Sequence, residues 1–145
     1  MTSPAANELV SSRFFPHSRQ RVFEAFSDPQ QLTLWFGPNG FTSSFEKFDF
    51  RIGGEWGFMF HGPNGTDYPN QSTFIEIVRN ERIVYDHVSL PNFQMTMTLA
   101  EEDGGTRFTW CMAFATAQLC ETLKPVCVPA NEENFDRLAT HLTSN

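Results

Sequence analysis

The residues of this chain with chemistry to offer are four histidines, three cysteines, and a scatter of serines and carboxylates. No serine lies in a G-x-S-x-G sequence, and no two histidines follow the H-E-x-x-H spacing of zinc hydrolases. The histidines are instead spread over the chain, at His17, His61, His87 and His141. Because the spacings of known metal and nucleophile sites are missing, we expect no metal, no cofactor and, on balance, no enzyme.

Asp86 is the main candidate for acid–base chemistry, with His87 beside it as the alternative. One choice of strand phase places it on the same side as Met95 and Met97 of the next strand. There an unpaired carboxylate would be costly, and it would take up a proton or find a donor. A turn of different length would instead point Asp86 outward and bring Tyr85 and His87 inward. Both phases stay open, and with them an acid–base role inside a pocket.

Large apolar side chains offer a second kind of chemistry, the binding of a flat or irregular apolar molecule. Indole rings stack on planar ligands and donate one hydrogen bond, and thioethers adapt to irregular shapes. The same side chains also fill cores, so both interpretations stay open. The residues concerned are Trp35, Trp56, Trp110, Met95, Met97 and Met112.

Composition and charge exclude several classes of function. The 17 acidic and 10 basic residues give a net charge of −7, which would repel a phosphate backbone. No cluster of lysine and arginine offsets this repulsion, so we expect no nucleic-acid partner. The 16 phenylalanines far outnumber the 2 tyrosines and 3 tryptophans, which predicts a largely phenyl interior.

Length and terminal sequence suggest one domain in a reducing compartment. A chain of 145 residues can bury one sizeable core, and no repeat or linker divides it, so we expect one domain over residues 1–145. Met1–Glu8 lacks a basic segment followed by an apolar run, and eighteen consecutive apolar residues occur nowhere. We therefore expect neither export nor membrane insertion. Three cysteines without C-x-x-C spacing suit free thiols, so a cytoplasmic location is expected.

The N-terminal third contains one strand and two short helices. Leu9–Phe15 is expected to be a strand, and Ser18 can cap the helix that follows. Asp28 can cap a second short helix, whose first position suits Pro29 because the missing amide hydrogen costs nothing there. Gly37-Pro38 is expected to end it.

The middle of the chain is a succession of strands and turns. If Ile52-Gly53-Gly54 forms a three-residue loop with Gly54 left-handed, Phe48 shares a face with Trp56 and Phe58, whereas a two-residue loop inverts this face. We favour an exposed pairing of the Asp49 and Arg51 charges. The strands are expected at Phe41–Arg51, Glu55–His61, Ser72–Val78, Ile83–Leu90, Phe93–Leu99 and Thr106–Ala115, with a long loop over Gly62–Asn70.

Alternation along the later strands predicts which side chains share the concave face. The expected inward residues are Ile75, Ile77, Val84, Asp86, Val88, Leu90, Phe93, Met95, Met97, Leu99, Phe108, Trp110, Met112 and Phe114. At the C-terminus, Ala117–Leu123 is expected to form a brief helix that Pro125 interrupts. Asn131 would then cap a last helix that buries Phe135, Leu138 and Leu142. A curved antiparallel sheet around one terminal helix is an α+β arrangement that forms a pocket.

Several short motifs, taken together, give the chain a resemblance to a known superfamily. They are Val22–Pro29, Leu32, Trp35–Pro38, Asp49–Trp56, Glu76–Val78, Glu81–Tyr85, Gly105–Arg107 and Phe135–Leu138. In order and spacing the chain resembles the START-like, Bet v 1-like or SRPBCC superfamily, and more narrowly the family of homologues of the activator of the heat-shock-protein-90 ATPase. One departure is that Cys120–Ala130 lacks the Gly-Trp pair that opens the last helix in relatives.

The resemblance implies the helix-grip fold, in which a curved seven-stranded antiparallel sheet surrounds a long C-terminal helix and two short helices follow the first strand. It implies a cavity that binds a small hydrophobic or aromatic molecule. Two alternatives stay open, namely a co-chaperone-like regulator of a heat-shock ATPase, with a role in stress response, and a polyketide cyclase- or hydrolase-like enzyme. A homodimer is also left open. The expected ligand-binding residues are Trp35, Phe48, Trp56, Phe58, Asp86, Met95, Met97, Trp110, Met112, Phe135 and Leu138.

Overall fold

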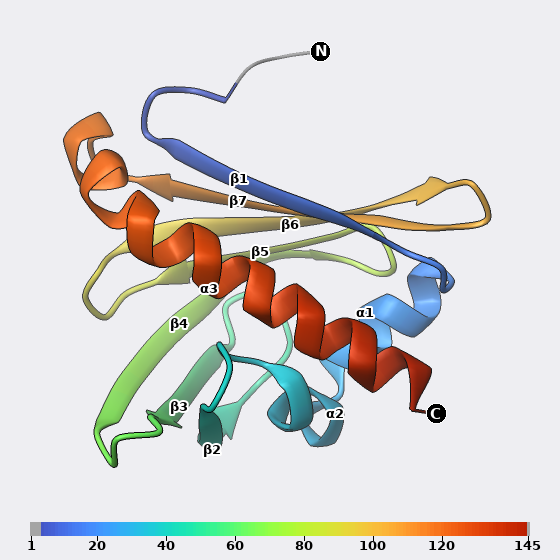
Figure 1. Cartoon of the computed structure of the whole chain (residues 1–145), viewed down its shortest axis with the longest axis horizontal. Coiled ribbons are helices and arrows are strands. Elements are labelled where there is room, and N and C mark those ends of the chain that lie inside the picture. The colour runs from blue at the N-terminus through green and yellow to red at the C-terminus, as the bar shows by residue number, and fades with distance from the viewer. Residues whose placement is uncertain (1–3, 145) are drawn as a thin grey trace.

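The computed structural model describes residues 4–144 and shows a seven-stranded antiparallel sheet curved around a long C-terminal helix (Figure 1). The strands follow one another across the sheet in the order β1-β7-β6-β5-β4-β3-β2, which confirms the expected fold class. Residues 1–3 of the N-terminal segment considered above lie outside the described residues. The elements are β1 (Glu8–Phe15), α1 (Arg19–Ser27), α2 (Pro29–Trp35), β2 (Thr42–Phe48), β3 (Glu55–His61), β4 (Asp67–Val78), β5 (Arg82–His87), β6 (Phe93–Glu102), β7 (Gly105–Phe114) and α3 (Ala117–Thr143).

The two short helices begin where the sequence predicts. The Ser18 hydroxyl accepts a hydrogen bond from the Arg21 amide at 3.1 Å, and the Asp28 carboxylate accepts one from the Gln30 amide at 3.0 Å. Each side chain satisfies an amide that has no partner within its own helix. Pro29 is the first residue of α2, as expected.

The β2–β3 connection places its aromatic side chains inward. Phe48 pairs with Trp56 across the strands, and the rings of Phe50 and Phe74 meet edge to face at 5.0 Å. The Asp49 carboxylate bonds the Arg51 guanidinium at 2.8 Å near the surface, as favoured above. Of the two loop alternatives, the inward Phe48 agrees with the three-residue loop, but the left-handed residue is Gly53, with φ of 83°, and not Gly54.

The expected loop over Gly62–Asn70 is wrong. β4 begins at Asp67, so only residues 62–66 connect β3 to β4, and Tyr68 pairs with Phe60. The first half of β4 is largely exposed, which leaves it without the apolar alternation that indicates a strand. Pro69 also suggested a turn, although it fits within this paired strand.

The expected inward face is wrong for β5 and for Ile75 of β4, and correct for Ile77 of β4, which packs against the core, and for β6 and β7. Ser72 and Phe74 are buried on β4, and Ile83, Tyr85 and His87 face inward on β5. Asp86 and Val84 therefore face the other way, while Ile75, Val88 and Leu90 are exposed. A bulge between Phe74 and Glu76 and the turn at Asn80, with φ of 64°, set this phase.

The C-terminal segment is one helix rather than two. The Thr116 hydroxyl caps α3 by accepting from the Leu119 amide at 3.1 Å, and Pro125 and Pro129 both lie inside the helix. The expected cap at Asn131 is therefore wrong, since this residue lies mid-helix and is buried. Phe135, Leu138 and Leu142 are buried as expected, and they hold the second half of α3 on the sheet.

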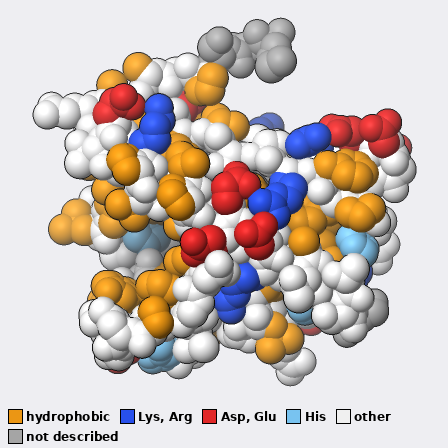
Figure 2. All heavy atoms as spheres, viewed as in Figure 1, with side chains coloured by type: hydrophobic (Ala, Val, Ile, Leu, Met, Phe, Trp, Pro, Cys, Tyr) orange, Lys and Arg blue, Asp and Glu red, His pale blue; other side chains and the backbone are white. Residues whose placement is uncertain are grey.

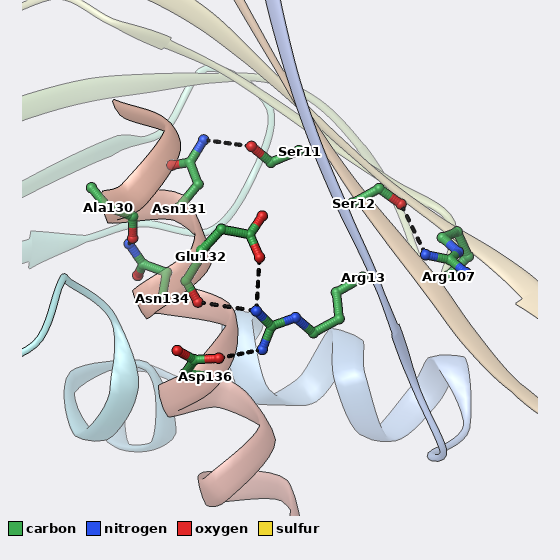
Figure 3. A network of polar contacts seen from close by, with 9 residues as sticks. All are labelled: Ser11, Ser12, Arg13, Arg107, Ala130, Asn131, Glu132, Asn134 and Asp136. Atoms are coloured by element: carbon green, nitrogen blue, oxygen red, sulfur yellow. Dashed lines mark hydrogen bonds and ion pairs between the residues drawn. The ribbon is translucent and has the colours of Figure 1, made fainter. Parts of the chain in front are cut away.

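Polar bonds fix the middle of α3 to β1 (Figure 3). The Arg13 guanidinium donates to the Glu132 carboxylate at 2.8 Å and to the Asp136 carboxylate at 2.6 Å. The Asn131 amide donates to the Ser11 hydroxyl at 3.2 Å. Figure 2 shows charged side chains gathered over this part of α3, whereas hydrophobic ones gather over its N-terminal half. The polar bonds to β1 therefore come from the second half of the helix.

No helix within residues 4–144 is both long enough and apolar enough to cross a membrane.

Candidate functional site

A cavity of about 240 Å³ lies between the concave face of the sheet and α3. Strands β3 to β7 supply one wall, and the N-terminal half of α3 supplies the other through Val126, Cys127 and Ala130. The segment that follows α2 closes a third side. Most of the lining is apolar, and its largest group is aromatic, including Phe36, Phe41, Trp56, Phe58, Phe60, Phe93 and Trp110.

Strand register assembles a row of side chains across this wall. Trp56 on β3 pairs with Ser72 on β4, Ser72 pairs with His87 on β5, and His87 pairs with Phe93 on β6. Paired residues on one face of a sheet have Cβ atoms about 4.5–5.5 Å apart. The register therefore places a hydroxyl and an imidazole between two aromatic rings.

His87 is held by hydrogen bonds at both ring nitrogens. Its Nδ1 lies 2.8 Å from the Pro91 carbonyl oxygen, which only accepts, so this nitrogen carries the proton. Its Nε2 lies 2.8 Å from the Asn70 side-chain oxygen, which also only accepts, so both contacts are hydrogen bonds only when the ring carries both protons. Burial lowers the pKa of His87 below its ordinary value, more than the hydrogen bond to Pro91 raises it. The two contacts fix the orientation of the ring at the cavity wall.

Tyr85 lies beside this row on the same face of β5. Only 3% of its surface is exposed, and its ring packs against Trp56 with a centroid distance of 5.4 Å. Burial raises the pKa of Tyr85, because the phenolate would lose its hydration. The phenol stays protonated and can act as a hydrogen-bond donor.

Two buried asparagines line the cavity from α3. The Asn131 amide nitrogen contacts the Ser11 hydroxyl and, at 3.5 Å, the Met112 sulfur. The Asn134 side-chain oxygen accepts from the Gly37 amide at 2.7 Å. These bonds join α3 to β1 and to the segment after α2, so they set the width of the cavity.

The structure brings together only part of the predicted site. Trp56, Phe58, Met95, Trp110 and Met112 line the cavity, as expected of a ligand-binding wall. The other six predicted residues, Asp86 among them, lie outside this lining, and the four most deeply buried of them, Trp35, Met97, Phe135 and Leu138, belong to the core. Phe48 is partly buried and packs against that core.

Asp86 does not line the cavity. Its carboxylate accepts a hydrogen bond from the Gln94 side chain at 3.0 Å on the exposed side of the sheet. The lining residues missed by the sequence analysis include Ser72, Tyr85, His87, Asn131 and Asn134. The alternative phase of β5 in the sequence analysis did point Tyr85 and His87 inward, whereas no sequence pattern indicated that the two asparagines line the cavity.

A second polar cluster lies away from this cavity. The Ser44 hydroxyl is 2.6 Å from His61 Nε2, and His61 Nδ1 is 2.8 Å from the Asp67 carboxylate. This connectivity is that of a Ser-His-Asp triad, built from three separate strands that sequence spacing did not connect. The three side chains are substantially exposed, and none of them lines the cavity. Within residues 4–144, no three His, Cys, Asp or Glu side chains form a group that could hold a metal ion.

A family model described as "Activator of Hsp90 ATPase homolog 1-like protein" matches residues 16–143. A comparison with curated proteins gives no match.

Solved structures with similar folds come from several bacteria. A Nitrosomonas europaea protein is 20% identical with a TM-score of 0.89, and the match covers 99% of each chain. A Rhodobacter sphaeroides protein is 19% identical with a TM-score of 0.90, over 99% of this chain and 97% of that one. A protein from Aeromonas hydrophila with the same family description is 14% identical with a TM-score of 0.78, over 94% and 92%. At these identities the likeness shows the fold.

Proposed function

Because this chain belongs to the Activator of Hsp90 ATPase homolog 1-like family, whose fold surrounds an internal space, we propose that it binds a small hydrophobic, ring-containing molecule between its sheet and α3. The observation that carries this proposal is the cavity of about 240 Å³ with an apolar wall rich in aromatic rings. Aromatic walls favour a planar guest, because offset stacking and edge contacts add to the burial of apolar surface.

The energetics of the cavity support an apolar occupant. An apolar void costs about 24 cal/mol per Å³, so an empty cavity of 240 Å³ would cost about 6 kcal/mol. This is comparable with the whole stability of a domain, about 5–15 kcal/mol. Water can enter from the open side and reduce the cost, but the aromatic rings offer it few hydrogen bonds. A ligand that fills the space would therefore stabilise the fold.

The volume also limits the size of the ligand. Cavities for drug-sized molecules measure about 300–1,000 Å³. At about 240 Å³ this cavity suits a compact molecule, smaller than a phospholipid or a sterol.

The fixed state of His87 favours binding over catalysis. A general acid or base needs a ring nitrogen that can reach the substrate. Here one nitrogen faces the Pro91 carbonyl and the other faces Asn70, while Asp86 points away from the cavity. We therefore place the enzymatic alternative second. The co-chaperone alternative rests on family membership alone.

Ligand binding can be tested with a neutral fluorescent probe, N-phenyl-1-naphthylamine. We expect saturable binding to the wild-type protein, and displacement of the probe by other compact aromatic molecules. Ala130→Phe should raise the probe Kd at least tenfold, because residue 130 lines the cavity from α3. Ala117→Phe is the matched control, since Ala117 is an exposed residue of the same helix. No saturable binding, or equal binding by both variants, would contradict the proposal.

A further inference from the structure

The wall of the cavity concentrates polar atoms that lack partners. Within residues 4–144, five buried side-chain nitrogen or oxygen atoms have no hydrogen-bond partner. Three of them, Trp56 Nε1, Ser72 Oγ and Trp110 Nε1, belong to residues that line this one cavity. Buried polar groups are nearly always paired in native proteins, so a group of exceptions at one place needs an explanation.

Tyr85 adds a fourth polar group to the same wall. This residue lines the cavity and is only 3% exposed, and its phenol keeps its proton and can donate a hydrogen bond. Tyr85 and Ser72 lie on adjacent strands, since Ser72 pairs with His87, two residues along β5 from Tyr85. Two residues with hydroxyls and two with indoles therefore belong to the wall of one cavity.

These groups are mainly donors. An indole nitrogen can only donate a hydrogen bond, and a hydroxyl can always donate one. The partner that they lack is an acceptor, such as a carbonyl or ether oxygen.

The wall carries no formal charge that could hold an ion. No Asp, Glu, Lys or Arg among residues 4–144 lines the cavity. An ionised ligand would therefore lose its hydration without gaining a counter-charge, which is costly.

We propose that the ligand is a neutral, ring-containing molecule with an acceptor oxygen, such as an aryl ketone, and that the Tyr85 hydroxyl donates to this oxygen. This inference rests on the proposed function, because it assigns the ligand class of the same cavity. The rings of the wall supply most of the affinity, and the donors orient the ligand and select for the acceptor.

A matched pair of probes tests separately the ligand class and the role of Tyr85 as the donor. 2-Acetylnaphthalene carries a ketone oxygen, and 2-ethylnaphthalene has a similar shape without an acceptor. The two probes differ in how strongly water solvates them, and this difference alone predicts a ratio of their Kd values. We expect the wild-type protein to bind the ketone about 3- to 10-fold more tightly than that ratio predicts, which corresponds to one neutral hydrogen bond. Tyr85→Phe should remove this preference and leave the Kd of 2-ethylnaphthalene unchanged. Ser43→Ala, which removes an unpaired buried hydroxyl outside the cavity lining, should leave it intact.

A spectroscopic measurement on the wild-type protein does not depend on the folding of a variant. The carbonyl stretch of bound 2-acetylnaphthalene should lie at lower frequency than in hexane, because donation to the oxygen weakens the C=O bond. Equal corrected affinities for the two probes, or an unshifted carbonyl, would overturn the ligand class and leave the proposed function standing. A preference that persists in Tyr85→Phe would overturn the assignment of Tyr85. Binding of neither probe would overturn both proposals.

Discussion

The Asn134 side chain on α3 accepts a hydrogen bond at 2.7 Å from the backbone amide of Gly37, which lies 97 residues earlier in the chain. The same loop accepts two hydrogen bonds from the Arg137 guanidinium, at the carbonyls of Gly37 and Pro38. Gly37 has φ of 119°, and a Cβ atom there would lie 2.9 Å from the ring of Phe60. The helix thus fixes a loop conformation that glycine alone adopts readily.

Asn134→Ala should destabilise the fold by about 1–3 kcal/mol, because it leaves the buried Gly37 amide without an acceptor. Urea unfolding measures this difference. Glu133→Ala is the matched control, since the Glu133 carboxylate accepts from the Asn39 amide on the exposed side of the same helix. We expect a loss below about 1 kcal/mol for the control. Equal losses in the two variants would show that the buried bond has no special role.

Leu138→Ala should lower the free energy of unfolding by about 2–5 kcal/mol, since this side chain is fully buried. The probe Kd of the folded protein should stay unchanged, because Leu138 does not line the cavity. Leu34→Ala is the control on an exposed leucine of α2 and should change stability by less than about 0.5 kcal/mol. A large loss of affinity in Leu138→Ala would place this residue in the binding site after all.

Acidification should destabilise the protein through its buried histidines. Burial lowers the pKa of both His87 and His141 in the folded state. Between the unfolded pKa of about 6.5 and the lower folded value, the unfolded chain binds more protons, so stability falls as the pH falls through this window. Unfolding free energies at pH 7.5 and 5.5 should differ less in His87→Gln than in the wild type. An identical pH dependence in this variant would contradict the prediction.

The Ser44, His61 and Asp67 cluster should not act as an esterase. Covalent catalysis gains most of its rate from holding the substrate against the nucleophile, and these exposed side chains lie outside the cavity that would bind one. We expect Ser44→Ala to hydrolyse p-nitrophenyl acetate at the wild-type rate. A burst of p-nitrophenol in the wild type that is lost in Ser44→Ala would contradict this.

The phase of β6 and β7 could be predicted from sequence, whereas that of β5 could not. Met95 and Met97 alternate with polar residues, so only one face can be buried. In β5, Val84 is only 7% exposed although it faces away from Tyr85, so apolar residues occupy both sides of the strand. The alternation of apolar and polar residues then favours neither face of β5, and the turn at Asn80 sets which residues point inward.

Sequence patterns also do not separate residues that line the cavity from residues that fill the core. Trp56 and Trp110 on the cavity wall and Trp35 in the core are all about 1% exposed, so no difference in burial pattern separates them. Trp35 differs by a tertiary hydrogen bond, because its indole nitrogen donates to the Ala25 carbonyl at 2.9 Å. Such partners depend on the packing of separate elements, which local patterns do not encode.

The two prolines of α3 have a consequence for how a ligand enters and leaves the cavity. Because Pro125 and Pro129 have no amide hydrogen, the carbonyls of Glu121 and Pro125 receive no i+4 bond within the helix. This weakened backbone lies over the cavity, while the Arg13 contacts fix the part of the helix that follows. We therefore expect the first turns of α3 to lift from the sheet far more often than the whole protein unfolds, so that loading and release leave most of the fold in place.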